Sequence, residues 1–185
     1  HNDLFFSDAE NLSGLKTLAQ VRERMMRFAS HPIHIAIQKS DSVNAFARSE
    51  SGYKLVVFTT GFIKQFGNDA DVLANTLGHE IAHHNLGHVH KDLDKVSLVN
   101  SETSLNKGYT QAELSQANEL AADKEGIQYA INASYSACGG YRLFSYLQDN
   151  HAKVNNTSNS SHPLTSERKN IANSLNLKLH QRSCS

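Results

Sequence analysis

Several features that would set a chain apart from ordinary globular proteins are absent here. No apolar run approaches the roughly 20 residues that a membrane-spanning helix needs, and the opening "HNDLFFSDAE" lacks the basic and apolar regions of a signal peptide. With 18 basic and 18 acidic residues, the charge balance gives no indication of binding to nucleic acid or to an anionic membrane. Only 10 glycines and 2 prolines among 185 residues, with 39% hydrophobic residues, exclude a disordered or fibrous protein.

Cysteine is also scarce, which limits the roles that its thiols can have. The only two, Cys138 and Cys184, are far too distant in the sequence for a C-x-x-C metal site. Two interpretations remain open. They are unrelated thiols, or they form one disulfide that ties the C-terminal tail to an earlier helix in an oxidising compartment.

The apolar pattern predicts an α+β fold that is mostly helical with a small β-sheet. Apolar residues at i, i+3 and i+4 indicate helices, and alternating β-branched segments indicate strands. We expect one domain over residues 1–185, with polar loops at 92–110 and 151–163. The expected helices are 12–29, 61–66, 70–91, 111–132, 136–149 and 165–177, and the expected strands are 33–37, 42–48 and 53–60, the last two forming a hairpin.

Histidine, in contrast, is concentrated in the stretch "NTLGHEIAHHNLGHVH" of the expected helix 70–91. "HEIAH" fits the motif H-E-x-x-H, in which His79 and His83 project from one face of a helix and can share one Zn²⁺. Glu80 is turned about 100° from His79, which places its carboxylate beside the metal. Zinc lowers the pKa of a bound water to about 7, so Glu80 can take a proton from that water at neutral pH.

A catalytic zinc site needs a third protein ligand, and His88 is one candidate. The pattern H-E-x-x-H-x-x-G-x-x-H would supply it, but the required glycine and histidine positions hold Leu86 and Val89. In a continuous helix His88 lies about 180° around the axis from His79 and faces away. Only a break at Gly87 would bring it back.

Glu119 is the better candidate for the third ligand. In "NELAAD", Glu119 and Asp123 occupy positions i and i+4 on one face of an alanine-rich helix. Glu119 would complete a His₂Glu set that leaves one position on zinc open, and Asp123 would accept the free N–H of a ligand histidine. Ala121 and Ala122 are small enough for the two helices to approach closely. The alternative is a pair of solvated carboxylates.

These motifs resemble those of the zinc metallopeptidases of the HtpX and CAAX prenyl endopeptidase group. "VNAFA", "HEIAH", "NELAAD" and "SHPLTSER" follow the order of that family's motifs, and the resemblance covers roughly residues 40–175. It implies a zincin-like fold of the gluzincin type, with one Zn²⁺ per chain and Glu119 as the third ligand. It also maps the family's H-P-x-x-x-x-R onto His162, Pro163 and Arg168.

The resemblance gives these last residues roles that their spacing alone does not. His162 would donate to the oxyanion that forms on the scissile carbonyl, or would occupy the open position on zinc and hold the enzyme latent. Arg168 would pair with an active-site carboxylate and fix its geometry. The strand 53–60 would offer an edge on which an extended or unfolded polypeptide substrate can lie.

The leading hypothesis is therefore a zinc endopeptidase in which Glu80 activates zinc-bound water. Many relatives carry transmembrane helices, and this chain looks like the family's periplasmic members, which act in cell-envelope protein quality control. The expected location is periplasmic or otherwise extracytoplasmic, with membrane association through an anchor missing from this sequence.

The alternative is a non-catalytic zinc-binding chaperone or scaffold module, although a structural site has no use for a base. An accidental motif would bind no stoichiometric metal.

Overall fold

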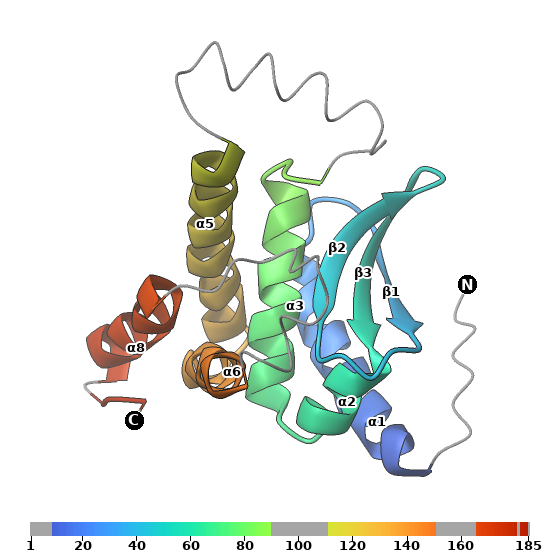
Figure 1. Cartoon of the computed structure of the whole chain (residues 1–185), viewed down its shortest axis with the longest axis horizontal. Helices are drawn as coiled ribbons and strands as arrows, with labels where there is room; N and C mark the ends of the chain where they lie inside the picture. The colour runs from blue at the N-terminus through green and yellow to red at the C-terminus, as the bar shows by residue number, and fades with distance from the viewer. Residues whose placement is uncertain (1–8, 90–110, 151–165, 181, 185) are drawn as a thin grey trace.

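The computed structural model describes residues 9–89, 111–150, 166–180 and 182–184. Helix α3 lies between the small sheet on one side and the helices α5, α6 and α8 on the other (Figure 1). This arrangement confirms the expected α+β fold with a mostly helical content. The elements are α1 (Ala9–Met25), the 3₁₀-helix η1 (Met26–Phe28), β1 (Ile33–Gln38), β2 (Ala45–Glu50), β3 (Tyr53–Thr59), α2 (Thr60–Phe66), α3 (Ala70–Asn85), α5 (Gln111–Asn132), α6 (Cys138–Asp149) and α8 (Ser166–His180).

The sheet has the strand order β1-β3-β2, with β3 parallel to β1 and antiparallel to β2. The expected hairpin is confirmed: it joins β2 to β3 through Ser51 and Gly52, whose φ angles of 50° and 82° are the positive values that a type I′ turn requires. The expectation that the strand 53–60 offers a free edge is wrong. Both edges of β3 are hydrogen-bonded, one to β1 and the other to β2. The expectation failed because the hydropathy pattern of a strand does not fix its place in the sheet.

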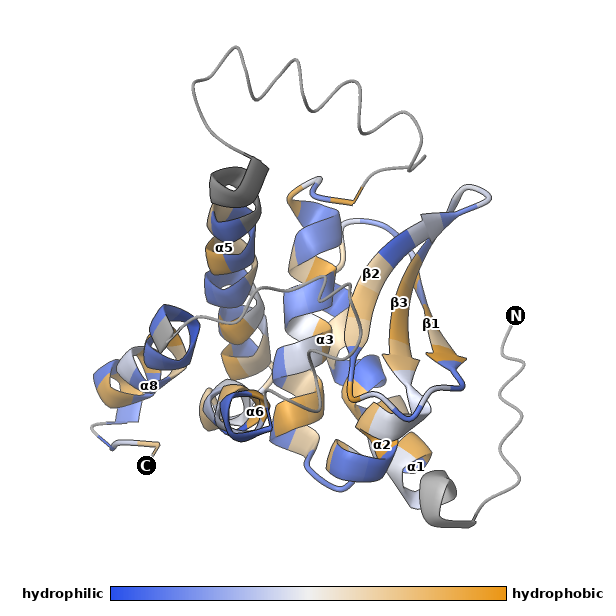
Figure 2. Ribbon diagram, viewed as in Figure 1, coloured by the Kyte–Doolittle hydropathy of each residue, from blue (hydrophilic) through white to orange (hydrophobic). Residues whose placement is uncertain are grey.

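The core sits where the sheet, α1 and α2 pack against the apolar face of α3. Val72, Leu73, Leu77 and Ile81 of α3 are completely buried there, together with Phe58 of β3. Figure 2 shows α3 changing from mostly apolar colours near its start to mostly hydrophilic colours towards its end. The apolar half anchors the helix, and the polar half, which carries the histidines, remains available for chemistry.

Asp69 caps the start of α3. Its carboxylate accepts a hydrogen bond from the backbone N–H of Val72 (3.1 Å) and two from Arg142, through Nε (2.9 Å) and Nη2 (2.8 Å). Partial burial acts to raise the pKa of Asp69, but the Arg142 hydrogen bonds and the Val72 N–H outweigh it, so the pKa is lowered. The ionised carboxylate therefore stabilises the fold.

This lowered pKa predicts a loss of stability in acid. Because the pKa of Asp69 is lower in the folded chain than in the unfolded chain, its contribution is complete above the unfolded value and is lost as pH falls through the folded value. Asp69→Asn keeps an acceptor for the cap but carries no charge. We expect this variant to be less stable than the parent at neutral pH. Its free energy of unfolding should also decrease less steeply as the pH is lowered. Urea denaturation between about pH 7 and pH 3 measures how the free energy of unfolding of each protein depends on pH. Asp149→Asn, at an exposed position, is the control. Parallel curves for the parent and Asp69→Asn would contradict the assignment.

Helix α3 ends at Asn85, six residues before the expected end, so the prediction of a helix to residue 91 is wrong there. Gly87 adopts φ +73°. Its N–H donates to the carbonyl oxygen of His84 (3.2 Å), and the N–H of His88 donates to the carbonyl oxygen of His83 (2.9 Å). These two bonds form a Schellman motif, the helix stop that a left-handed glycine permits. The chain reverses at this point and does not continue as a helix.

The two cysteines form a disulfide, which decides between the two interpretations that the sequence left open. Cys138 at the start of α6 is bonded to Cys184, four residues beyond the end of α8. The segment that follows α8 is thus bonded covalently to the start of α6, and Ala172 of α8 shares an apolar cluster with Ile127 of α5 and with Ala137, the residue before α6. None of the described helices combines the length and apolar character that crossing a membrane requires.

Candidate active site

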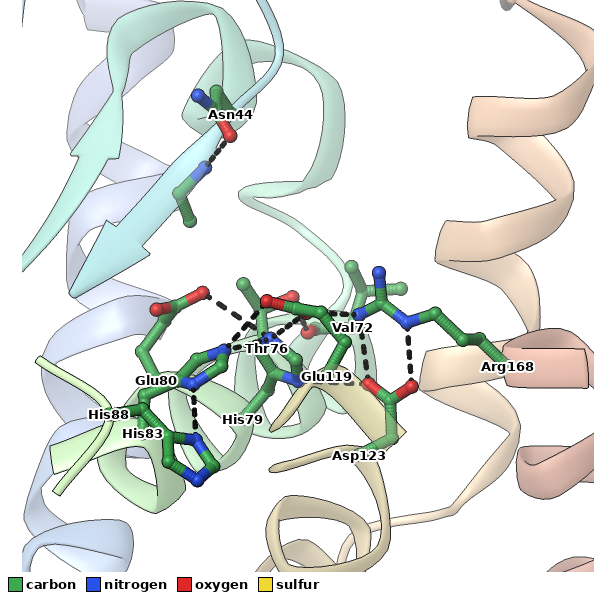
Figure 3. A network of polar contacts seen from close by, with 11 residues as sticks. Asn44, Val72, Thr76, His79, Glu80, His83, His88, Glu119, Asp123 and Arg168 are labelled. Atoms are coloured by element: carbon green, nitrogen blue, oxygen red, sulfur yellow. Dashed lines mark hydrogen bonds and ion pairs between the residues drawn. The ribbon is translucent and has the colours of Figure 1, made fainter. Parts of the chain in front are cut away.

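Three side chains from two helices converge at the polar half of α3 (Figure 3). The Nε2 atoms of His79 and His83 lie 3.0 Å apart. Each lies 3.1 Å from a different carboxylate oxygen of Glu119, which projects from α5. All three residues are buried, and their ligand atoms form the candidate metal cluster found in the described part of the chain.

The cluster fits a tetrahedral zinc ion in its donor types and its spacing. Two imidazoles and one carboxylate are the ligand set of many catalytic zinc sites, which leave the fourth position open. Donors at about 2.0–2.1 Å from zinc, placed at tetrahedral corners, lie about 3.3 Å from one another. The observed separations of 3.0–3.1 Å need only small adjustments to reach that value.

Glu80 lies beside this cluster and not within it. Its Oε1 atom is 3.9 Å from the Nε2 atom of His79, too far for a shared hydrogen bond but close to any molecule held by the three ligands. The side chain is buried at 1% exposure. In Figure 3 its carboxylate approaches the cluster from the side opposite to Arg168. The arrangement places a base next to the open side of the candidate metal position.

A chain of hydrogen bonds supports His79 from behind. Its Nδ1 atom lies 2.8 Å from Oδ1 of Asp123. Nη2 of Arg168 donates to the same oxygen (2.9 Å), and Nε of Arg168 donates to Oδ2 of Asp123 (2.6 Å). Nη2 of Arg168 also lies 3.1 Å from Oε2 of Glu119. Burial acts to raise the pKa of Asp123, but the hydrogen bonds from Arg168 and His79 outweigh it, so the pKa is lowered. Asp123 is therefore held as an anion, which keeps the proton of His79 on Nδ1 and its lone pair on Nε2.

Arg168 reaches this position from the first turn of α8 and is itself buried at 3% exposure. Its guanidinium also stacks over the ring of Phe144, with the carbon Cζ 4.7 Å from the ring centroid. The structure thus pairs Arg168 with the carboxylates of Asp123 and Glu119, the kind of pairing that the resemblance implied. Arg168 is therefore a positioning residue.

Two glycines, which sequence reasoning missed, allow α3 and α5 to approach this closely. A Cβ atom on Gly78 would collide with the carbonyl oxygen of Gly126, and one on Gly126 would collide with the backbone of Gly78 and His79. The expectation credited Ala121 and Ala122 with this role. Ala122 is buried but Ala121 is exposed, so that explanation holds for one of the two at most. The available signal was a glycine directly before H-E-x-x-H and another three residues after Asp123.

We expect Gly126→Ala to destabilise the protein and to weaken metal binding. In an isolated helix this change is favourable by about 1 kcal/mol, but here the new methyl group forces the helices apart at about 1–3 kcal/mol. The sign of the change in unfolding free energy, measured in urea, therefore tests the close approach. Lys124→Ala on the exposed face of α5 is the control. A more stable Gly126→Ala variant would contradict this account.

The other histidines of the stretch have different positions. His84 is buried, and its Nε2 atom lies 2.7 Å from the carbonyl oxygen of Leu55, so it packs against the sheet. Burial lowers the pKa of His84. His88 was expected to face away from the site, but the reversal after Gly87 places its Nδ1 atom 3.0 Å from the Nδ1 atom of His83. His162 and Pro163 lie outside the described residues.

A cavity of about 90 Å³ opens beside the cluster. Glu80, His79, Asp123 and Arg168 are among the residues that line it, and most of its wall is apolar. At about 10–15 Å³ per water its volume holds about six to nine waters, comparable to the heavy atoms of a large amino-acid side chain. The apolar wall includes Val43, Ala45, Phe62, Ile127, Leu143 and Phe144.

Comparison with models of known protein families supports this geometry. A comparison with curated proteins finds no match to the chain. The model of the family described as Peptidase family M48 matches residues 15–109, just over half of the chain. The matched segment includes His79, Glu80 and His83 but ends before Glu119, which the fold brings to the same point from α5. From this match, the chain belongs to peptidase family M48, a family of metallopeptidases.

Proposed function

We propose that this protein is a zinc-dependent endopeptidase of the HtpX and CAAX prenyl endopeptidase type that cleaves unfolded or extended polypeptides. One observation carries the proposal: three ligand atoms 3.0–3.1 Å apart lie next to a buried glutamate at the wall of a cavity. A metal site that serves structure alone has no use for that glutamate or for an adjoining cavity.

The residues divide the chemistry between them. Zinc, when bound by His79, His83 and Glu119, would polarise the scissile carbonyl and make a water molecule more acidic. Glu80 accepts the proton of the attacking water on its carboxylate and delivers it to the nitrogen of the leaving amine. Asp123 and Arg168 hold His79 and Glu119 in place, so these side chains need no rearrangement during the reaction.

The cavity supports a peptide substrate. Its apolar wall suits a substrate side chain next to the scissile bond, because burying such a side chain contributes about 1.5–3 kcal/mol of binding. A polypeptide must be extended or unfolded for one side chain to enter while its backbone passes Glu80. We therefore propose that the substrates are unfolded segments and not compact domains.

The proposed setting is the cell envelope, outside the cytoplasm. The disulfide between Cys138 and Cys184 supports it, since disulfides form and persist in oxidising compartments. A role in protein quality control fits a preference for unfolded chains. We also propose association with the membrane through an anchor, which none of the described helices provides.

The proposal predicts that cleavage depends on one bound zinc ion per chain. Elemental analysis of the purified protein should find this stoichiometry. A chelator should abolish cleavage of unfolded casein, and added Zn²⁺ should restore it. Metal without cleavage of any unfolded substrate, in the parent and in His162→Ala alike, would favour a non-catalytic zinc module, and the His162→Ala variant guards against a latent enzyme. Absence of stoichiometric metal would reject both functions.

A further inference from the structure

His83 has a partner on the side of its ring that faces away from the candidate metal position. Its Nε2 atom lies 3.0–3.1 Å from His79 and Glu119, so this nitrogen is the one available to a metal. Its other nitrogen, Nδ1, lies 3.0 Å from Nδ1 of His88. Figure 3 shows His88 on the far side of the His83 ring from Glu119. His88 is therefore placed behind a ligand and not among the ligands.

The backbone holds His88 in this place. The Schellman motif bonds the N–H of His88 to the carbonyl of His83 (2.9 Å), so the two residues are joined through both backbone and ring. The rings are inclined at 65° with their centroids 5.2 Å apart. A Cβ on Gly87 would meet nothing within 4 Å, so this glycine is required for its φ of +73° and not for space.

The chemistry of imidazole fixes the direction of the hydrogen bond. A neutral His83 that offers the lone pair of Nε2 to a metal must carry its proton on Nδ1. That N–H needs an acceptor, and Nδ1 of His88 is one when the proton of His88 is on Nε2. His79 has the carboxylate of Asp123 in the corresponding position. The two ligand histidines thus have different supports, one anionic and one neutral.

We propose that His88 is a positioning residue for the metal ligand His83, accepting the hydrogen bond of its Nδ1–H and fixing its tautomer and ring orientation. This inference rests on the proposed metal site. Partners of this kind typically contribute about 10–100-fold to metal affinity. The sequence contains the feature as a glycine and a histidine placed four and five residues after the second histidine of H-E-x-x-H.

The affinity of the full chain for Zn²⁺, measured by competition with a chromophoric chelator, tests the proposal. His88→Phe keeps an aromatic ring but has no acceptor, and we expect it to bind Zn²⁺ about 10–100-fold more weakly than the parent. His88→Asn places an amide oxygen near the position of Nδ1 and should restore most of the affinity. Leu86→Ala, an exposed change at the same helix end, should bind as the parent does. The absorption spectrum of the Co²⁺-loaded protein should change in His88→Phe alone.

The outcomes separate this inference from the proposed function. If the parent binds no Zn²⁺, the metal site itself is rejected. If the parent binds Zn²⁺ and His88→Phe binds it equally well, the role of His88 is rejected and the metal site stands. Should His88→Phe fail to fold, ¹⁵N nuclear magnetic resonance of the zinc-loaded parent still decides the question. A proton on Nε2 of His88 supports the inference, and a proton on its Nδ1 overturns it.

Discussion

Replacing Glu80 with glutamine is expected to lower kcat for the cleavage of unfolded casein by about 10²–10⁴-fold. Glutamine has nearly the same shape but cannot accept the proton of the attacking water. The Oε1 atom of Glu80 lies 3.9 Å from the Nε2 atom of His79, and Glu80 is not one of the three clustered residues, so metal binding should persist. Elemental analysis beside a cleavage assay measures both quantities.

Two comparisons make the Glu80→Gln result specific. Glu23→Gln, an exposed change on α1, should leave both turnover and metal content unchanged. Circular dichroism and thermal unfolding of Glu80→Gln should match those of the parent, since the substitution is isosteric. Turnover close to that of the parent, with full metal content, would reject Glu80 as the base.

The second large effect is expected from Arg168→Leu, which should lower the free energy of unfolding by about 3–5 kcal/mol. The guanidinium is buried and pairs with Asp123 at 2.6 and 2.9 Å and with Glu119 at 3.1 Å. Removing it leaves two buried carboxylates without their cation. Urea denaturation of the metal-free protein measures this loss without a contribution from bound zinc.

The neighbouring Lys169 provides a matched control for Arg168. It lies on the same turn of α8, but its Nζ atom is directed over the ring of Tyr141, 4.8 Å from the centroid. Lys169→Leu should therefore cost about 1 kcal/mol or less. Arg168→Lys keeps the charge but loses the bidentate hydrogen bonding, so its loss of unfolding free energy should lie between those of the two leucine variants. Equal losses for Arg168→Leu and Lys169→Leu would contradict the importance of the buried pair.

The regular elements could be predicted because their signals are local. The alternating strands and the apolar spacing of α3 each lie within a few residues of the structure that they determine. The end of α3 was not predicted, since Gly87 in a helical pattern can be either tolerated or a stop, and polar residues follow in both cases. The central place of β3 depends on a parallel pairing with β1, which no local pattern records.

The residues of the site also divide into those with a local signal in the sequence and those without one. His79, Glu80 and His83 follow from one helical motif, and Glu119 with Asp123 from the spacing on a second helix. Arg168 was identified through family resemblance alone, because its pairing joins α8 to α5 over 45 residues of sequence. Gly78 and Gly126 were missed, and His88 was considered only as a third ligand and not as a partner of His83. Their roles come from a helix crossing and a chain reversal, both of which are properties of the tertiary structure.

The disulfide has a consequence for an enzyme that meets proteases, including other copies of itself. Any single backbone cut between Cys138 and Cys184 produces two pieces that remain one molecule, because the sulfur bridge spans the cut. The severed α8 would stay near α6 at an effective concentration on the order of millimolar, and Arg168 could return to Asp123. Nicked protein would then migrate as one band on a gel without reductant and as two with it, while it still cleaves its substrate.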